Sequence, residues 1–181
     1  MTNLTKRQIE IIVLCEDKQQ WVFIRQYLVS SGFRNNKITP LWTLSGSGEK
    51  FVRNQYAKEV KTLRSKNYRS SLRLVVMIDA DVETTEKHLQ ELATELEKAG
   101  LNERQSDEKI AVFIPKRNIE TWIHYLMGTE VDETTAYAKF NHESNCKPYI
   151  ENLAQNICPV GLPLNAPPSL HHACDELKRI L

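Results

Sequence analysis

Two short runs of apolar residues, each ended abruptly by acidic residues, constrain the fold of this chain more than any other feature. The first covers residues 11–15 and the second covers residues 74–78. Continuous apolar runs of this length are typical of strands that are buried on both faces of a sheet. Neither run approaches the roughly 20 residues that a membrane-spanning helix needs. The sequence therefore predicts two central strands of a largely parallel sheet.

Helical patterns alternate with these strands. Four strands are predicted, over residues 11–15, 38–44, 72–78 and 110–114. Helices are predicted between them, over residues 18–31, 50–65 and 83–98. Strands that alternate with helices in this way predict an α/β fold with a mostly parallel four-stranded sheet flanked by helices.

From residue 119 onward the pattern becomes helical and looser. Further helices are predicted over residues 119–127, 132–140, 148–155 and 169–181. We therefore expect an α/β domain over residues 1–127 and a helical C-terminal appendage, over residues 128–181, that packs on it.

Charge and composition bear on the classes of partner and on the compartment. The chain has 24 Lys and Arg against 23 Asp and Glu, so no overall imbalance points to nucleic acid or to a membrane. The first residues lack the apolar segment of a signal peptide, which predicts a cytoplasmic protein without membrane contact. The four cysteines include no Cys-x-x-Cys pair, so neither a zinc site nor a disulfide is predicted.

Acidic residues follow three of the four predicted strands. Glu16 and Asp17 follow the first, Asp79 and Asp81 the third, and Glu120 comes shortly after the fourth. In a parallel sheet the carboxyl ends of the strands share one edge, where ligands bind. Carboxylates gathered there are costly unless a cation neutralises them or a proton is shared. Mg²⁺ suits such oxygen ligands, and no soft ligands or paired histidines suggest zinc.

Each of these groups also has a simpler interpretation. The acids after the first strand could cap the next helix, as could those after the third. Lys116, Arg117 and Glu120 could begin an ordinary solvated helix. Their joint placement at three strand ends favours a shared site.

Three segments resemble the motifs of the Toprim domain, in the version found in OLD-family nucleases and related small phage-defence proteins. They are Val13-Leu-Cys-Glu16, Val75-Val-Met-Ile-Asp79-Ala-Asp81 and Pro115-Lys-Arg-Asn-Ile-Glu120-Thr-Trp-Ile. The resemblance covers residues 9–127 and implies a Toprim-like, Rossmannoid fold.

The resemblance also implies roles for individual residues. Carboxylates at matching positions would hold Mg²⁺ or Mn²⁺: Glu16, Asp79 and Asp81 would bind one ion, and Glu120 would complete a second metal site. Glu16 could instead act as the general acid or base, and Lys116 or Arg117 would neutralise charge on a phosphate. The implied reaction is hydrolysis of phosphodiesters in DNA or RNA, within a prokaryotic defence or repair system. Because OLD-type nucleases commonly work with an ATPase, a separate ATPase is an expected partner, and a homo-oligomer is left open.

The chain departs from the Toprim pattern at two positions. Many Toprim proteins have Gly directly after the first Glu, and the nucleases often carry another acid four positions beyond it. Here those positions hold Asp17 and Gln20. A catalytically inactive module that binds nucleic acid or protein is therefore the second hypothesis. A phospho-acceptor receiver domain is a third, but it would need a fifth strand before its Lys.

Basic residues concentrate over residues 50–73, where eight Lys and Arg oppose a single acid. We expect this basic strip to bind nucleic-acid phosphates, with Tyr56 and Tyr68 stacking on bases, although a solvated helix face is the alternative. The residues predicted to contact nucleic acid are Lys50, Arg53, Lys58, Lys61, Arg64 and Arg117. The acidic region over residues 83–108 is expected to face away from nucleic acid.

The histidines carry little signal in the sequence. His124, His142 and the pair at residues 171–172 have no metal partner at convincing spacing and are interpreted as structural or incidental. The turn at residues 46–50 lacks the full spacing of a phosphate loop, so ATP binding is not expected.

Overall fold

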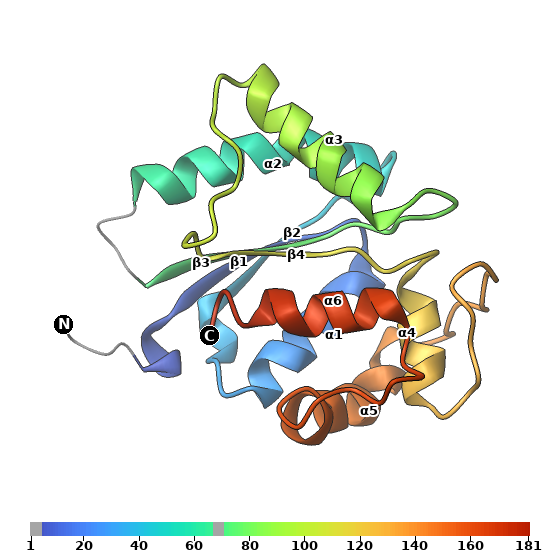
Figure 1. The fold of residues 1–181 in the computed structure, drawn as a ribbon. Coiled ribbons are helices and arrows are strands. Elements are labelled where there is room, and N and C mark those ends of the chain that lie inside the picture. Colours follow the sequence, from blue (N-terminus) through green and yellow to red (C-terminus); the bar gives the residue numbers. More distant parts are fainter. Residues whose placement is uncertain (1–4, 67–70) are drawn as a thin grey trace.

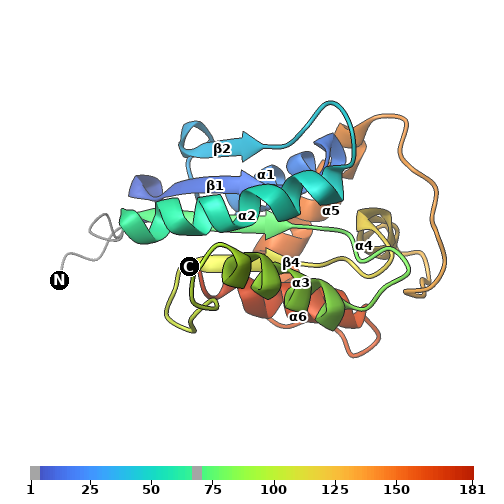
Figure 2. The ribbon, with the colours of Figure 1, turned by 90° about the horizontal axis from the view of Figure 1, so that it is seen from above.

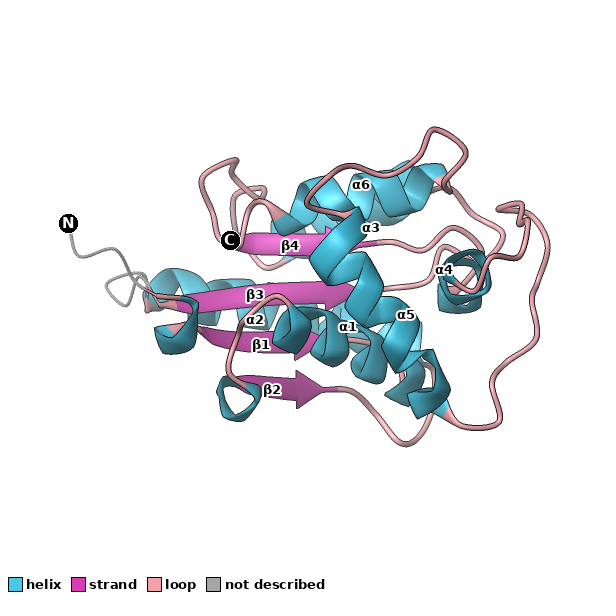
Figure 3. Cartoon of the chain, turned by 90° about the horizontal axis from the view of Figure 1, so that it is seen from below, coloured by secondary structure: helices cyan, strands magenta, loops and turns pink. Residues whose placement is uncertain are grey.

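The apolar runs form four parallel strands in the computed structural model, which describes residues 5–66 and 71–181. The strands are β1 (Glu10–Leu14), β2 (Ile38–Leu41), β3 (Leu72–Met77) and β4 (Ile110–Phe113). They lie in the order β2-β1-β3-β4, and each neighbouring pair is parallel, as Figure 3 shows. The predicted α/β fold with a parallel four-stranded sheet is confirmed. The second strand is shorter than predicted: it ends at Leu41, whereas the prediction extended it to residue 44.

Helices cover both faces of this sheet (Figures 1 and 2). On one face lie α2 (Gly48–Ser65) and α3 (Thr85–Lys98). On the other lie α1 (Lys18–Ser30), α4 (Ile119–Leu126), α5 (Lys147–Asn152) and α6 (Pro168–Leu177). Single turns of 3₁₀-helix occur at Lys6–Gln8, Asn35–Lys37 and Glu143–Cys146. None of the described helices combines the length and apolar character needed to cross a membrane.

Side chains of the central strands alternate between two hydrophobic cores, one on each face. On β3, Val75 and Met77 enter the core beneath α1, whereas Leu74 and Val76 enter the core beneath α2 and α3. This alternation follows from the two-residue period of a strand. It explains why the strands appear in the sequence as continuous apolar runs.

The C-terminal helices belong to the first of these cores. Leu153, Leu170 and Leu177 pack in the same cluster as Phe23 of α1. Burial of this kind stabilises a protein by roughly 25 cal/mol for each Å² of apolar surface removed from water. The C-terminal region therefore forms part of the layer that covers this face of the sheet.

The last helix also covers the outer edge of β4. Glu176 on α6 is buried, accepts the backbone N–H of Val112 at 2.8 Å and forms an ion pair with Arg104. Arg104 in turn donates to the carbonyl of Ile110 at 3.1 Å. An unpaired edge strand can recruit a strand from another chain. Here side chains satisfy backbone groups of β4, so that edge is blocked.

Two predictions for the C-terminal region are wrong. The segment predicted as a helix over residues 132–140 is irregular, because the Asp132 carboxylate accepts bonds from the backbone N–H and hydroxyl groups of Thr134 and Thr135. Such local bonds compete with helix formation.

Cys158 and Cys174 form a disulfide, although none was predicted. Their Cα atoms lie 5.9 Å apart: Cys158 follows a π-helical turn over residues 153–157, and Cys174 lies on α6.

The covered edge of β4 gives a stability prediction. Replacing Glu176 with Ala should lower the free energy of unfolding by roughly 3 kcal/mol, because Arg104 and the N–H of Val112 lose a buried partner. Urea unfolding measures the change. Asp175→Ala is the matched control on the same helix, since it removes only an exposed pair with Lys178 and should cost about 0.5 kcal/mol or less. Equal losses in the two variants would contradict this role for Glu176.

Candidate metal centre at the carboxyl edge of the sheet

The residues that follow β1 and β3 meet at the carboxyl edge of the sheet. The two strands are neighbours in register, with Leu14 opposite Val76. Just beyond them, Oε1 of Glu16 accepts the backbone N–H of Asp79 at 2.5 Å. The helix after β1 lies on one face of the sheet and the helix after β3 on the other (Figure 1). Glu16 and Asp79 therefore lie at the switch in strand order, where α/β proteins bind ligands.

Several contacts fix Glu16 in place. Its backbone N–H donates to Oε1 of Gln20 at 2.9 Å, and the N–H of Gln20 donates to Oδ1 of Asp17 at 2.9 Å. Asp17 is thus the N-cap of α1, as the simpler interpretation proposed. A Cβ on Gly48 would lie 2.7 Å from both Cβ and the carbonyl oxygen of Glu16. The first turn of α2 therefore packs directly against this residue.

The turns after β3 and β4 are held together in a strained conformation. Asp81 and Arg117 have φ angles of 49° and 70°, and the N–H of Asp81 donates to the carbonyl of Arg117 at 2.8 Å. Residues other than glycine pay roughly 1–3 kcal/mol for such backbone, and they cluster at functional sites. Thr84, rather than Asp79 or Asp81, caps α3. The capping interpretation is therefore wrong for these two acids.

Glu120 reaches the edge from the first turn of α4. Glu120 is only 3% exposed, and Trp122 and Ile123 anchor the helix in the core. The indole N–H of Trp122 donates to Oγ of Ser169 at 2.8 Å, which ties α4 to α6. Asp17 and Glu120 line a common hollow of about 150 Å³. The packing of α4 therefore brings Glu120, the acid that follows β4, towards Asp17, which follows β1.

Burial and mutual repulsion raise the pKa values of these carboxyl groups. Burial, followed by the charges of Asp81 and Asp17, raises the pKa of Glu16 to about 7. Burial, followed by the charges of Glu16 and Glu120, raises the pKa of Asp79 well above its usual range. The pKa of Glu120 is raised by burial and, more weakly, by Asp17. The predicted acids thus act on one another electrostatically.

The chemistry of this edge fits a hard divalent cation. Oδ1 of Asp79 is buried, and the Gln20 side chain lowers the pKa of this carboxyl by less than burial and the neighbouring charges raise it. Such an oxygen is costly unless a proton or a cation meets it. The candidate ligands are all carboxylates, which Mg²⁺ and Mn²⁺ accept. In the described part of the chain, however, no three ligand atoms from these acids lie within 4.8 Å of one another.

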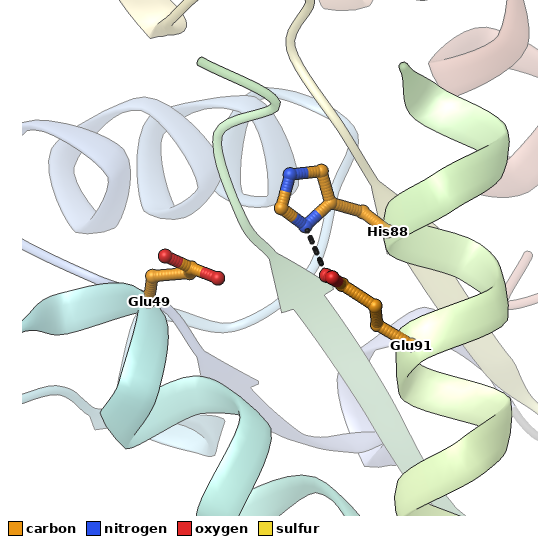
Figure 4. Close-up of side chains that lie close together, drawn as sticks. All are labelled: Glu49, His88 and Glu91. Carbon is orange, nitrogen blue, oxygen red and sulfur yellow. Dashed lines mark ion pairs between the residues drawn. The ribbon is translucent and has the colours of Figure 1, made fainter. Parts of the chain in front are cut away.

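A second group of possible ligands lies nearby, between α2 and α3. Glu49 comes from α2, and His88 and Glu91 come from α3 (Figure 4). One ligand atom from each lies within 4.8 Å of the others, so this trio could hold a metal ion. The trio is not apparent from the sequence. His88 and Glu91 form a short His-x-x-Glu spacing, which does not predict a metal site unless a third ligand such as Glu49 is known to lie beside it. Helix packing alone brings Glu49 to them.

The basic strip is partly neutralised by the acidic region of α3 and the following loop. Arg53 lies 3.3 Å from Glu49 and 3.5 Å from Glu91. Arg64 pairs with Glu108 at 2.5 Å. The acidic region therefore lies beside the basic strip and pairs with two of its arginines. Charge counting along the sequence could not show which neighbour each arginine would meet.

Other residues predicted to bind nucleic acid differ in exposure. Lys50, Lys58 and Lys61 are exposed on α2. Tyr56 is only 2% exposed and packs in the core, so it cannot stack on a base. Tyr68 lies outside the described residues.

The two basic residues after β4 lie at the carboxyl edge. The ammonium group of Lys116 donates to the backbone carbonyl of Glu83. Arg117 is half-buried in the strained turn beside Asp81. Lys116 therefore contributes to holding the loop before α3, a role that the sequence did not indicate.

Comparison of the chain with family models, with curated proteins and with solved structures found no match in any of the three. The function is therefore argued from the residues of this chain.

The raised pKa of Glu16 predicts how stability without metal depends on pH. Between pH 4.5, the ordinary pKa of a glutamate, and about pH 7, the Glu16 carboxyl keeps its proton in the folded state. In the unfolded state it has released that proton. The free energy of unfolding should therefore fall as the pH rises from about 5 to 8, by on the order of 3 kcal/mol. Urea unfolding in the presence of a chelator, repeated across this range, measures the decline.

Glu16→Gln provides the matched variant, because its side-chain oxygen can still accept the N–H of Asp79. The decline with pH should be smaller in this variant, and added Mg²⁺ should stabilise the wild type most at the alkaline end. A decline of the same size in wild type and variant would contradict the assignment to Glu16.

Proposed function

We propose that this protein is a Mg²⁺- or Mn²⁺-dependent phosphodiesterase that acts on DNA or RNA at the carboxyl edge of its sheet. The contact between Glu16 and Asp79 at the switch in strand order carries the proposal. Two carboxyl groups whose pKa values are raised by burial and by each other need protons or a cation. A divalent cation meets that need and also binds phosphate oxygens.

Four side chains would hold the metal in this proposal. Glu16 and Asp79 would supply the central ligands, and Asp81 and Glu120 would complete the site from either side. A bound divalent cation would lower the pKa of a water ligand and stabilise charge on the leaving oxygen. Gln20 positions Glu16 for this role, because its side-chain oxygen accepts the backbone N–H of Glu16. The backbone pairing of Asp81 with Arg117 keeps the two loops together.

Phosphate binding would depend on a smaller basic surface than the sequence suggested. Lys50 begins the exposed row of lysines at the end of α2 nearest the carboxyl edge, and Lys58 and Lys61 continue it. Arg53 and Arg64 contribute less because their charges already face carboxylates. Arg117 would meet a phosphate at the edge itself. A prokaryotic defence or repair role and an ATPase partner remain part of the proposal through the Toprim resemblance alone.

A catalytically inactive binding module is the second candidate. Two observations favour it: Asp17 is engaged as the cap of α1, and no three carboxylate oxygens of the proposed site form a compact set among the described residues. Such a module would bind nucleic acid through the lysines of α2 without cutting it. Neutralising Asp79 and Asp81 together would then leave the affinity for nucleic acid unchanged.

Cleavage assays test the proposed chemistry. Single- and double-stranded DNA and RNA are incubated with the full chain and Mg²⁺ or Mn²⁺. Cleavage should fall at least about 100-fold in Asp79→Asn and in Glu16→Gln, because each removes a charged metal ligand. Glu86→Gln, which changes an exposed acid on α3, should retain full activity. Absence of cleavage by the wild type, or full activity in Asp79→Asn, would overturn the proposal.

The lysine row gives a separate prediction about binding. Each of Lys58→Gln and Lys61→Gln should weaken binding to duplex DNA and reduce the slope of log affinity against log salt by about 0.9, the value for one lost phosphate contact. Fluorescence anisotropy over a salt series measures the slope. Lys178→Gln, directly after α6, removes the same charge from the other face of the sheet and should leave the slope unchanged. Equal slopes in all three variants would place the nucleic acid elsewhere.

A further inference from the structure

His88 is a buried histidine with one ring nitrogen that has no hydrogen-bond partner among the described residues. The residue is 4% exposed, and its Nε2 lies 3.3 Å from the carbonyl oxygen of Ala80. A carbonyl only accepts hydrogen bonds, so Nε2 must carry a proton and donate it. In the neutral ring, Nδ1 then presents a lone pair. That atom is buried and makes no hydrogen bond to any described residue.

The lone pair of His88 faces a carboxylate. Nδ1 lies 3.1 Å from Oε2 of Glu91, which is also buried and without a hydrogen-bond partner in the described part of the chain. Two acceptors at this distance repel each other unless a proton or a cation lies with them. The carboxylate of Glu49 approaches the pair from α2 (Figure 4). Three potential ligands from two helices thus point towards one small volume.

We propose that Glu49, His88 and Glu91 bind one divalent transition-metal ion of the Zn²⁺ or Mn²⁺ class, at a site separate from the carboxyl-edge centre. An imidazole nitrogen favours these ions over Mg²⁺, which prefers oxygen ligands. Two carboxylates and one imidazole also leave a coordination position for water. Metal-bound histidines almost always donate their other ring N–H to a carbonyl or carboxylate. The bond from His88 to Ala80 already has that form.

Arg53 is the competing positive charge at this position. Its Nη1 lies 3.3 Å from Oε1 of Glu49 and 3.5 Å from Oε2 of Glu91, and its Nη2 lies 3.7 Å from Oε1 of Glu95. One guanidinium faces the two carboxylates of the trio, so a net negative charge remains. Glu95 offers Arg53 a partner outside the trio. The arginine can therefore stay paired when a metal ion takes the carboxylates.

A metal ion held by the trio would brace the neighbouring edge of the sheet. Glu49 directly follows Gly48, which packs against Glu16. His88 is bonded to Ala80, which lies between Asp79 and Asp81. The ion would therefore join the first turn of α2 to α3 at the point where both helices support the acidic loops. This site goes beyond the proposed function and does not depend on nuclease activity.

Metal titration of the full chain tests the site. The protein is stripped of metal with a chelator and titrated calorimetrically with Zn²⁺ and, separately, Mn²⁺, each in the presence of excess Mg²⁺ to occupy oxygen-only sites. At least one of the two ions should bind with a stoichiometry of one. His88→Gln should weaken that binding at least 10-fold, whereas Glu97→Gln, which changes an exposed acid on the same helix, should leave it unchanged. Co²⁺ absorption should show a nitrogen ligand in the wild type and lose it in His88→Gln.

Every outcome separates the alternatives. Binding of neither ion to the wild type would show that a proton shared by His88 and Glu91 occupies the position, and would overturn the proposal. Equal affinity in wild type and His88→Gln would overturn it as well. If His88→Gln fails to fold, Glu49→Gln removes a partly exposed ligand at the start of α2 and should produce the same loss. Asp79→Asn should keep this binding, so failure of the carboxyl-edge proposal would be seen separately.

Discussion

The hydrogen bond from the backbone of Asp79 to the Glu16 carboxylate joins the ends of the two central strands. It holds the Glu16 carboxylate in a mostly buried position, where the charges of Asp81 and Asp17 act on it. β1 and β3 are buried on both faces, so their ends cannot separate without exposing the cores. The packing of the sheet therefore maintains an unfavourable concentration of negative charge, which a divalent cation would relieve.

Much of this arrangement follows from local features of the sequence. Continuous apolar runs indicated strands covered on both faces, and alternation with helices indicated that they are parallel. Parallel strands end at one edge, so a shared edge for Glu16 and Asp79 could be expected from the order of the elements, whereas the pairing of β1 with β3 that sets them side by side could not. Trp122 and Ile123 likewise indicated that α4 packs inward and holds Glu120 near that edge. The catalytic roles of these acids remain a proposal.

The features that the sequence did not reveal depend on contacts between distant segments. The disulfide of Cys158 with Cys174 requires the C-terminal turn to pack beside α6. Arg53 would serve nucleic acid if α2 stood alone, but α3 lies against it and supplies Glu91. Packing of these two helices also assembles the trio around His88. In each case the contact depends on how closely two segments that are distant in the sequence pack together. Neither hydrophobic periodicity nor charge counting predicts that distance.

The two candidate sites share a structural frame but differ in chemistry. The carboxyl-edge centre offers only oxygen ligands, whereas the trio offers a nitrogen as well, so one would select Mg²⁺ or Mn²⁺ and the other Zn²⁺ or Mn²⁺. Anomalous diffraction from a crystal soaked in Mn²⁺ tests the central claim most directly. A peak within coordination distance of both the Glu16 and Asp79 carboxylates is the expected result. Well-ordered carboxylates with no peak between them would contradict the assignment of a metal centre to this edge.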